Sequence, residues 1–507
     1  MQLLQTPPVA AARLSPSATE VNLPGIHPHT TPASPSAMSD ATTFPEDAKT
    51  TRIYAGKLFD SEARILLPNR LITIAVDSGL ILSVDVYKLG DVPSEKSEDV
   101  IDLSDTTVFP GLVDTHVHFF LHSYSETTWD DQLTKESLAE RTVRATVHAK
   151  RTLMAGFTSV RDLGTEGAFD ADIALRKCLS GPNALIPGPR YFCASKAIIA
   201  TGSYGPKSSL YPSQDGIDGV TGAEIVDGEV ECLKAVRRQI GAGADWIKIY
   251  ADYRVRSRMA DVAPGLAGTA ITTFNKKELQ VMIDEATSRG VKVAIHAADW
   301  GRIRGLAVNT IEHGAESIPP YPETATRSEI VDLWRRYELR NRHTTWVPTL
   351  AVMYNSGAAR WARASSTFRA ALEAGYDNIA CGGDTGAFAH GENALELQLM
   401  EKLGAPWQKV LSWATLGGWK SIRPRTWEGR EGEIRLARVA SLSEDPRQVG
   451  DNEVAFGIIK RGFVADIVAT TGDLEKDFPG AVSKDKITFV MKGGRVYKHE
   501  GRPVADY

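Results

Sequence analysis

Short apolar runs near both ends of the chain alternate with polar residues and stop at turn-forming residues. Four of these runs are bounded by Gly, Asp or Asn: 52–55, 71–76, 465–469 and 487–494. Short runs with such boundaries are typical of β-strands. The pattern therefore predicts that residues 49–108 and 426–507 together build one small composite β-sandwich domain.

The middle of the chain, residues 109–425, alternates short apolar runs with stretches of helical periodicity. Eight of the runs are expected to be strands: 112–118, 157–161, 190–194, 245–250, 291–296, 309–313, 345–350 and 379–384. Between them, residues 275–289 have the signals of a complete helix, because Asn275 can cap its start and Gly290 can end it. Alternating strands and helices build parallel sheets. The sequence thus predicts an α/β fold with a (β/α)₈ TIM-type barrel beside the small β domain.

The first 48 residues differ in composition from the rest of the chain. Prolines recur there among Ser, Thr and Ala, a composition that cannot bury enough apolar surface to fold. We predict that residues 1–48 form a disordered Pro-rich tail. The tail lacks the continuous apolar segment of a secretory signal, which favours a cytoplasmic protein, and Met38 is an alternative start.

Composition and charge exclude some classes of partner. The 507 residues are 42% hydrophobic and 24% charged, and 58 basic against 63 acidic residues give a net charge of −5. This balance provides no basic surface for nucleic acid. The longest apolar stretch, residues 71–86, contains Asp77 and Asp85 and is shorter than the roughly 20 residues that span a membrane. We expect neither nucleic acid nor a membrane as a partner.

Two histidines close the first predicted barrel strand. His116 and His118 are two residues apart, so their side chains point to the same face of a strand. Two imidazoles at the carboxyl end of a barrel strand are well placed to bind a metal ion. A pair of partly exposed histidines in a turn is the plainer interpretation of His-x-His alone. The preceding Pro-Gly-Leu-Val-Asp makes the metal interpretation more specific.

A lysine lies within the fourth predicted barrel strand, residues 245–250. Trp246, Lys248 and Tyr250 are expected to face the barrel interior, while the two isoleucines between them face the helices. An ammonium group there is costly unless it is paired or chemically changed. One interpretation is an ion pair with an interior Asp. The other is carbamylation by carbon dioxide, which converts the cation into a carboxylate that can bridge two metal ions.

Three further residues end predicted strands. His296 and His313 close the fifth and sixth strands, and two histidines in phase with the first pair favour metal binding over a structural role. Asp384 closes the eighth strand after two glycines, which permit a close backbone approach. A helix N-cap is the other interpretation of Asp384, because Thr and Gly follow it.

This order of His-x-His, Lys, His, His and Asp resembles the binuclear branch of the amidohydrolase superfamily, and more narrowly the imidazolonepropionase, prolidase-like and ochratoxinase-like amidohydrolases. The resemblance covers roughly residues 51–500 and includes Pro-Gly-Leu-Val-Asp-Thr-His-Val-His, Thr-Ile-Glu-His-Gly, Gly-Gly-Asp-Thr-Gly and Gly-Phe-Val-Ala-Asp-Ile-Val. It implies a hydrolase that cleaves an amide, peptide-like or cyclic amide bond of a small-molecule substrate. It also leads us to expect a homo-oligomer.

The resemblance further implies two divalent metal ions. Their ligands would be His116, His118 and Asp384 on one ion, His296 and His313 on the other, and N6-carboxylated Lys248 between them. Zn²⁺ suits these nitrogen and oxygen donors, and Mn²⁺, Fe²⁺ or Co²⁺ would also fit. Two cations about 3.5–4 Å apart lower the pKa of a shared water, whose hydroxide attacks the carbonyl carbon. Asp384 and Lys248 are the expected catalytic residues, with Asp384 acting as general base and then general acid.

The chain departs from its relatives at the expected mouth of the barrel. Where many relatives have a histidine after the third strand, this chain has Tyr204, whose hydroxyl can donate to an oxyanion but does not carry a proton readily near pH 7. Tyr250 and Arg254 follow the fourth strand, and an arginine can grip a carboxylate with two hydrogen bonds. We expect these three residues and His390 to bind the substrate. A solvated rim loop is the alternative.

Two other functions fit parts of the pattern. A mononuclear deaminase of a heterocyclic amine would keep the His and Asp ligands but would not need Lys248. A non-catalytic metal-binding relative would be expected to have lost ligands, and none is lost here.

Overall fold

The computed structural model describes most of the chain that follows the Pro-rich tail. The described residues are 49–94, 97–181, 184–203, 222–254, 270–303, 305–317, 326–340, 343–445 and 450–504. The predicted disordered tail, residues 1–48, lies outside them, so its disorder stays a prediction. Among the described residues, no helix has both the length and the apolar character needed to cross a membrane.

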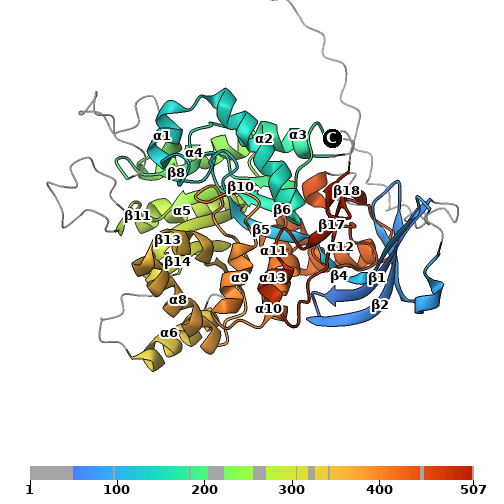
Figure 1. Cartoon of the computed structure of the whole chain (residues 1–507). Coiled ribbons are helices and arrows are strands. Elements are labelled where there is room, and N and C mark those ends of the chain that lie inside the picture. Colours follow the sequence, from blue (N-terminus) through green and yellow to red (C-terminus); the bar gives the residue numbers. More distant parts are fainter. Residues whose placement is uncertain are drawn as a thin grey trace, which may run out of the picture. The chain divides into compact units, whose positions relative to one another are not determined.

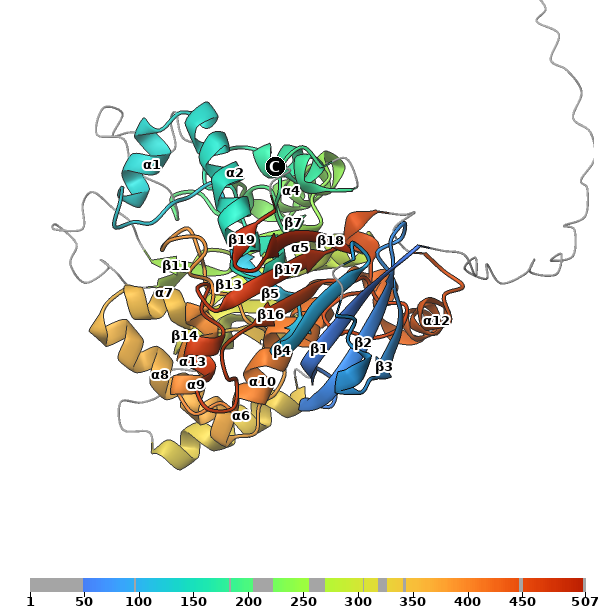
Figure 2. The same cartoon turned by 45° about the vertical axis from the view of Figure 1, so that its right-hand side comes forward.

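Strands from both ends of the chain pair in one eight-stranded sheet, in which the blue strands β1 to β4 lie beside the red strands β16 to β18 (Figure 2). These strands are β1 (Thr50–Asp60), β2 (Ile65–Ala75), β3 (Ile81–Val86), β4 (Val100–Pro110), β16 (Ile467–Thr470), β17 (Ile487–Lys492), β18 (Arg495–His499) and β19 (Arg502–Pro503). Their order is β19-β18-β17-β16-β4-β1-β2-β3. β4 joins the two ends of the chain, because it pairs parallel with β1 and antiparallel with β16.

The sequence pattern predicts a β-sandwich, whereas the hydrogen-bonded ladder runs through all eight strands as one sheet. The two faces of this sheet pack against different apolar clusters of side chains. Ile467 and Ala469 join an apolar cluster with Ile53 and Phe489, while Val468 belongs to the main core shared with the middle of the chain. Because the middle segment covers that second face, no second sheet is needed to bury it.

The middle of the chain forms parallel strands in two sheets, with the orders β5-β6-β7 and β15-β14-β13-β10-β8-β9. These strands are β5 (Leu112–Val117), β6 (Phe157–Asp162), β7 (Arg190–Cys193), β8 (Ala197–Ile199), β9 (Ala223–Ile225), β10 (Trp246–Tyr250), β13 (Lys292–Asp299), β14 (Thr310–Ser317) and β15 (Thr345–Val347). Seven of the eight predicted barrel strands are among them, and they pair in parallel. A short antiparallel ladder of β11 (Asp252–Arg254) and β12 (Ala270–Thr272) follows β10. The α/β class is confirmed.

The eighth predicted strand, residues 379–384, is not a regular strand. This segment makes isolated bridges to two neighbours, with Ile379 opposite Trp346 and Thr385 opposite Val117. Asp384 has a left-handed φ of 62°, which a regular extended strand does not contain. The bridges nevertheless place the segment beside both β15 and β5.

Helices pack against the parallel strands, with α2 on β6, α4 on β10, α5 on β13 and α8 on β14 (Figure 1). The helices are α1 (Trp129–Lys135), α2 (Leu138–Met154), α3 (Ala171–Leu179), α4 (Gly228–Ala242), α5 (Lys276–Ser288), α6 (Arg327–Arg340), α7 (Leu350–Asn355), α8 (Ala358–Glu373), α9 (Leu395–Lys402), α10 (Trp407–Ser412), α11 (Gly418–Ile422), α12 (Gly429–Ala440) and α13 (Phe478–Ala481). The predicted helix is confirmed as α5. The Asn275 side chain accepts hydrogen bonds from the first turn, and Gly290 follows the end with a φ of 75°.

A buried ion pair joins the parallel strands to the eight-stranded sheet. Arg190 begins β7 and Asp466 directly precedes β16, and their side chains are each 1% exposed. The guanidinium donates a hydrogen bond to the carboxylate, which also accepts one from the backbone of Gly493 at 2.8 Å. Without Asp466, the Arg190 guanidinium would lose its fully buried counter-charge and would keep Asp451, whose carboxylate lies 3.5 Å away and is 20% exposed, so part of a buried charge would be left uncompensated.

We predict that Asp466→Ala lowers the free energy of unfolding by about 3–5 kcal/mol, because Arg190 would lose its buried counter-charge. Urea-induced unfolding followed by circular dichroism measures this loss. Glu475→Ala is the control, since it breaks an ion pair with Lys57 whose side chains are 48% and 56% exposed, and it should cost less than about 1 kcal/mol. Equal urea midpoints for the two variants would contradict the prediction.

Candidate metal centre

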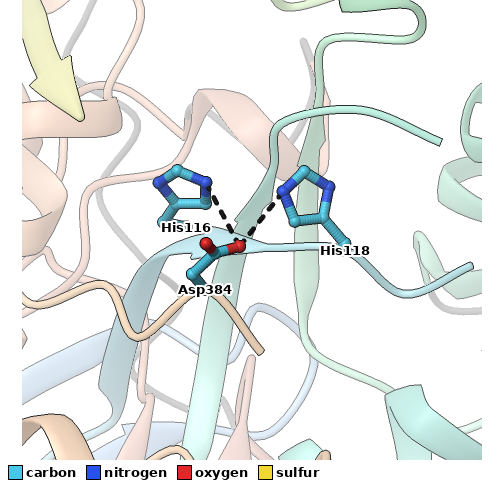
Figure 3. A group of neighbouring side chains, drawn as sticks. All are labelled: His116, His118 and Asp384. Atoms are coloured by element: carbon cyan, nitrogen blue, oxygen red, sulfur yellow. Dashed lines mark ion pairs between the residues drawn. The ribbon is translucent and has the colours of Figure 1, made fainter. Parts of the chain in front are cut away.

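His116, His118 and Asp384 converge at the carboxyl end of β5. The Nε2 atoms of His116 and His118 lie 3.6 Å and 3.3 Å from Asp384 Oδ1, and both rings are directed at this carboxylate (Figure 3). One donor atom from each residue lies within 4.8 Å of the others. The two-residue spacing thus brings both imidazoles to one side, as expected from strand alternation.

A buried carboxylate fixes the ring of His116. The His116 Nδ1 atom is 2.8 Å from Glu312 Oε2, and Glu312 Oε1 accepts a hydrogen bond from Arg161 at 2.8 Å. Burial favours a protonated Glu312, but the charge of Arg161, the hydrogen bond and charge of His116 and the charge of Lys248 together outweigh burial and lower the pKa of Glu312. Glu312 is therefore an acceptor for Nδ1–H of His116. This tautomer leaves the Nε2 lone pair of His116 available to a ligand.

The backbone fixes the ring of His118. Its Nδ1 donates to the carbonyl oxygen of Gly164 at 2.8 Å, so Nε2 faces Asp384. Burial disfavours the charged ring, but the hydrogen bond to Asp384 and its negative charge outweigh burial and raise the pKa of His118 to about 9. Burial lowers the pKa of His116 to about 4. The Asp384 carboxylate thus stabilises a positive charge on His118, whereas burial favours the neutral form of His116.

Backbone geometry positions Asp384. Its φ of 62° is left-handed, which costs about 1–3 kcal/mol in a residue other than glycine. The Asp384 N–H donates to the His116 carbonyl at 2.9 Å, and a Cβ on Gly382 would lie only 2.9 Å from the backbone nitrogen of His116. The expected close approach is confirmed at Gly382. Residues 385–394 form turns, so the N-cap interpretation of Asp384 is wrong.

Lys248, His296 and His313 lie next to this group. The His313 ring centroid is 4.9 Å from that of His116 and 4.4 Å from that of His296. Lys248 is 1% exposed in the middle of β10, and burial lowers its pKa to about 8. Within the described part of the chain, neither Lys248 Nζ nor His296 Nδ1 has a hydrogen-bond partner. Since buried nitrogen atoms are normally hydrogen-bonded, both atoms fit a site for a bound ligand, and the expected alternative of a Lys–Asp ion pair is not seen.

Of the residues expected to bind the substrate, Tyr250 lies beside this second group. Its ring stacks on His296, with centroids 4.6 Å apart and planes at 22°. Tyr204 lies outside the described residues, as does the side chain of Arg254, whose backbone ends β11. The substrate roles of these two residues stay predictions.

His390 is engaged in other contacts. Its Nε2 is 2.9 Å from the carbonyl oxygen of Leu121, and its ring stacks on that of His148 at 4.2 Å. It lines a cavity of about 690 Å³ whose lining contains none of the six predicted metal ligands. His148 in turn binds the carbonyl oxygen of Phe119. These contacts make His390 a support for the backbone that follows His118, and its expected role in substrate binding stays a prediction.

The residues that support the predicted ligands were not predicted from the sequence. Glu312 stands beside His313 in the Thr-Ile-Glu-His-Gly motif, and Arg161 lies in the buried strand β6. A charged residue in an apolar strand is costly unless it is paired. The presence of a charge in such a strand was therefore the sequence feature that could have indicated an ion pair of Glu312 and Arg161. Glu166, a 3% exposed carboxylate in the loop after β6 that accepts a hydrogen bond from Trp129 Nε1 at 3.1 Å, gave no comparable signal.

The model of the Amidohydrolase family matches residues 107–424, which include the six predicted ligands. The ochratoxinase of Aspergillus niger is 26% identical over 481 residues, which cover 90% of this chain and 88% of that enzyme.

Solved structures are similar along the same length. The crystal structure of a Xaa-Pro dipeptidase with methionine bound in its active site has a TM-score of 0.66 and 26% identity, covering 89% of this chain and 100% of that one. The crystal structure of A. niger ochratoxinase has a TM-score of 0.66 at 22% identity, covers 90% and 96% of the two chains, and shows the likeness in fold. The family model matches more than half of this chain, so the chain belongs to the amidohydrolase family and is a hydrolase acting on carbon–nitrogen bonds.

Proposed function

We propose that this hydrolase cleaves an amide or peptide-like bond of a small molecule with two divalent metal ions, for which Zn²⁺ fits the donor atoms. One observation carries the proposal. His116 and His118 both direct Nε2 at Asp384 Oδ1 within a buried group, and the amine of Lys248 lies buried nearby without a hydrogen-bond partner in the described part of the chain.

The proposed ligands are His116, His118 and Asp384 for one ion, His296 and His313 for the other, and Lys248 between them. Imidazole nitrogens and carboxylate oxygens are suitable donors for such ions. Lys248 would become a ligand by adding carbon dioxide to its neutral amine, which forms an N–C bond and releases one proton. The resulting carbamate would be an anion with two oxygen donors, so it would replace a buried ammonium group that has no hydrogen-bond partner among the described residues with a buried anion between two cations.

The chemistry that the two ions supply, when bound, is activation of a water molecule and polarisation of the substrate carbonyl. Asp384 is the residue proposed to move the proton. Its side chain is 16% exposed, against 1% for His116 and 7% for His118, so it is the member of the group that a substrate can reach. Its carboxylate would accept the proton of the attacking water and give it to the leaving nitrogen.

The substrate class is proposed from the mouth of the site. Tyr250, stacked on His296, offers an aromatic surface, and we propose Tyr204 and Arg254 as further contacts to a ring or a carboxylate. The names of two relatives, ochratoxinase and Xaa-Pro dipeptidase, support amide or peptide-like substrates.

We also propose that the parallel strands close into an eight-stranded barrel. Residues 378–385 support this closure, because they accept backbone hydrogen bonds from both sides. The backbone N–H of Trp346 in β15 donates to the carbonyl oxygen of Asn378, and the backbone N–H of Thr115 in β5 donates to that of Cys381. The barrel would then comprise residues 109–425 and the β domain residues 49–108 and 426–507. A homo-oligomeric state and a cytoplasmic location stay predictions.

A mononuclear deaminase is the competing function, and Lys248 distinguishes it. A site with one metal ion does not require a bridging ligand, so it does not require the buried amine of Lys248 between two groups of ligands. Counting the bound ions in the purified enzyme therefore separates the two functions.

We predict about two divalent ions per wild-type chain and fewer than one in Lys248→Ala, whose activity should fall on the order of 10³-fold because a bridging ligand is lost. Metal analysis by mass spectrometry and hydrolysis of N-acyl amino acids and Xaa-Pro dipeptides measure these effects. Short carboxylic acids should restore part of both, since they can replace the carbamate.

Lys292→Ala is the matched control for this experiment. Lys292 is another buried lysine, on the neighbouring strand β13, and it pairs with Glu428 at 2.6 Å. Its loss should affect stability and leave the metal content near two ions. Full metal occupancy in Lys248→Ala would rule out the bridging role.

We predict that Glu312→Gln weakens metal binding by roughly 10–100-fold, because the charged acceptor that orients His116 is lost. Competition with a chelator measures the affinity. Glu396→Gln is the control, since Glu396 is a buried carboxylate that accepts a backbone hydrogen bond from Ala351, and its metal affinity should equal that of wild type. Equal affinities in all three proteins would remove the role assigned to Glu312.

A further inference from the structure

The backbone of His313 leaves the regular path of β14. Thr310 and Glu312 both accept hydrogen bonds from Arg161, whereas Ile311 between them packs in the main apolar core. A regular strand would therefore turn His313 towards the core, on the same face as Ile311. Instead, His313 and Gly314 have left-handed φ angles of 68° and 62°, and the imidazole lies against the rings of other ligands.

Two residues, one in β15 and one just before α7, hold His313 in this conformation. Trp346 in β15 donates from its indole Nε1 to the His313 carbonyl oxygen at 2.7 Å. The Thr349 hydroxyl lies 2.8 Å from His313 Nδ1, and Thr349 itself has a left-handed φ of 50°. Both side chains are completely buried. The carbonyl and the ring of His313 are thus bound from one short segment.

The backbone after His313 also fits against an aromatic ring. A Cβ on Gly314 would lie 1.9 Å from Trp300 Nε1, so only glycine can follow His313 in this arrangement. Trp300, Trp334 and Trp346 form one buried aromatic group, with centroid distances of 4.9–5.6 Å. This group stands directly behind the left-handed turn.

We propose that Trp346 is a positioning residue for the second metal ion. Its indole N–H binds the carbonyl oxygen of His313, keeps the turn left-handed and so keeps the imidazole directed into the site. The inference rests on the proposed two-metal function. The ligands of the other ion are positioned by different contacts, namely Glu312, the Gly164 carbonyl and the close approach at Gly382. Because these contacts do not involve the indole N–H of Trp346, loss of this N–H should affect the second ion and not the first.

The test compares Trp346→Phe with Trp334→Phe. Both variants remove the same atoms from the same aromatic group, because the Trp334 ring lies 4.9 Å from that of Trp346 and is also fully buried. Trp334 Nε1, however, has no hydrogen-bond partner among the described residues. The difference between the variants therefore isolates the hydrogen bond to His313 from the loss of ring volume.

Metal-free enzyme is titrated with Co²⁺, and visible absorption and bound cobalt are measured. We expect Trp346→Phe to bind its first ion as wild type does and its second ion roughly 10–100-fold more weakly, with an altered absorption spectrum for that ion. Trp334→Phe should match wild type in both steps. With saturating Co²⁺, Trp346→Phe should lower kcat more than it raises KM.

Replacement of Trp346 by benzothienylalanine, which has sulfur in place of the indole N–H, provides a second variant with an almost unchanged ring volume. It should reproduce the weak second step even if Trp346→Phe fails to fold. Two Co²⁺ ions in wild type and an unchanged second step in the benzothienylalanine variant would overturn this inference alone. Fewer than two ions in wild type would overturn the two-metal function, and the inference with it.

Discussion

The buried ion pair between Arg161 and Glu312 links the candidate metal centre to the strands that hold it. Both side chains are 0% exposed, and Arg161 also donates to the carbonyl of Thr115 and the hydroxyl of Thr310. One guanidinium therefore spans β5, β6 and β14. Because a charge left alone in the interior is costly, the orientation of His116 depends on the relative register of these three strands.

Left-handed backbone conformations bring two of the donor groups to the site. His313 and Asp384, both candidate ligands, have positive φ angles, and such residues persist only where their surroundings fix them. Asp384 is fixed by the carbonyl of His116 and His313 by Trp346 and Thr349. In each case the left-handed φ angle changes the direction of the side chain. The side chain no longer follows the two-residue alternation of a strand and points instead towards donor atoms on other strands.

The parts of this fold that depend on local alternation could be predicted from the sequence. Seven of the predicted parallel strands, the convergence of His116 and His118, and the burial of Lys248 all follow from the alternation of faces along a strand. The irregular segment 379–384 and the single sheet could not be predicted, because they depend on backbone angles and on which segments cover a face. The same holds for Glu312, whose partners Arg161 and His116 are 151 and 196 residues away in sequence.

Most of the donor groups are supported by a segment other than their own. The loop after β6 binds the ring of His118, β14 binds the ring of His116, β15 binds the backbone of His313, and β5 binds the backbone of Asp384. The positions of the donors are therefore set by the packing of buried strands. Substitutions outside these buried strands can therefore accumulate without moving the donors, which is consistent with a TM-score of 0.66 at only 26% identity to the Xaa-Pro dipeptidase.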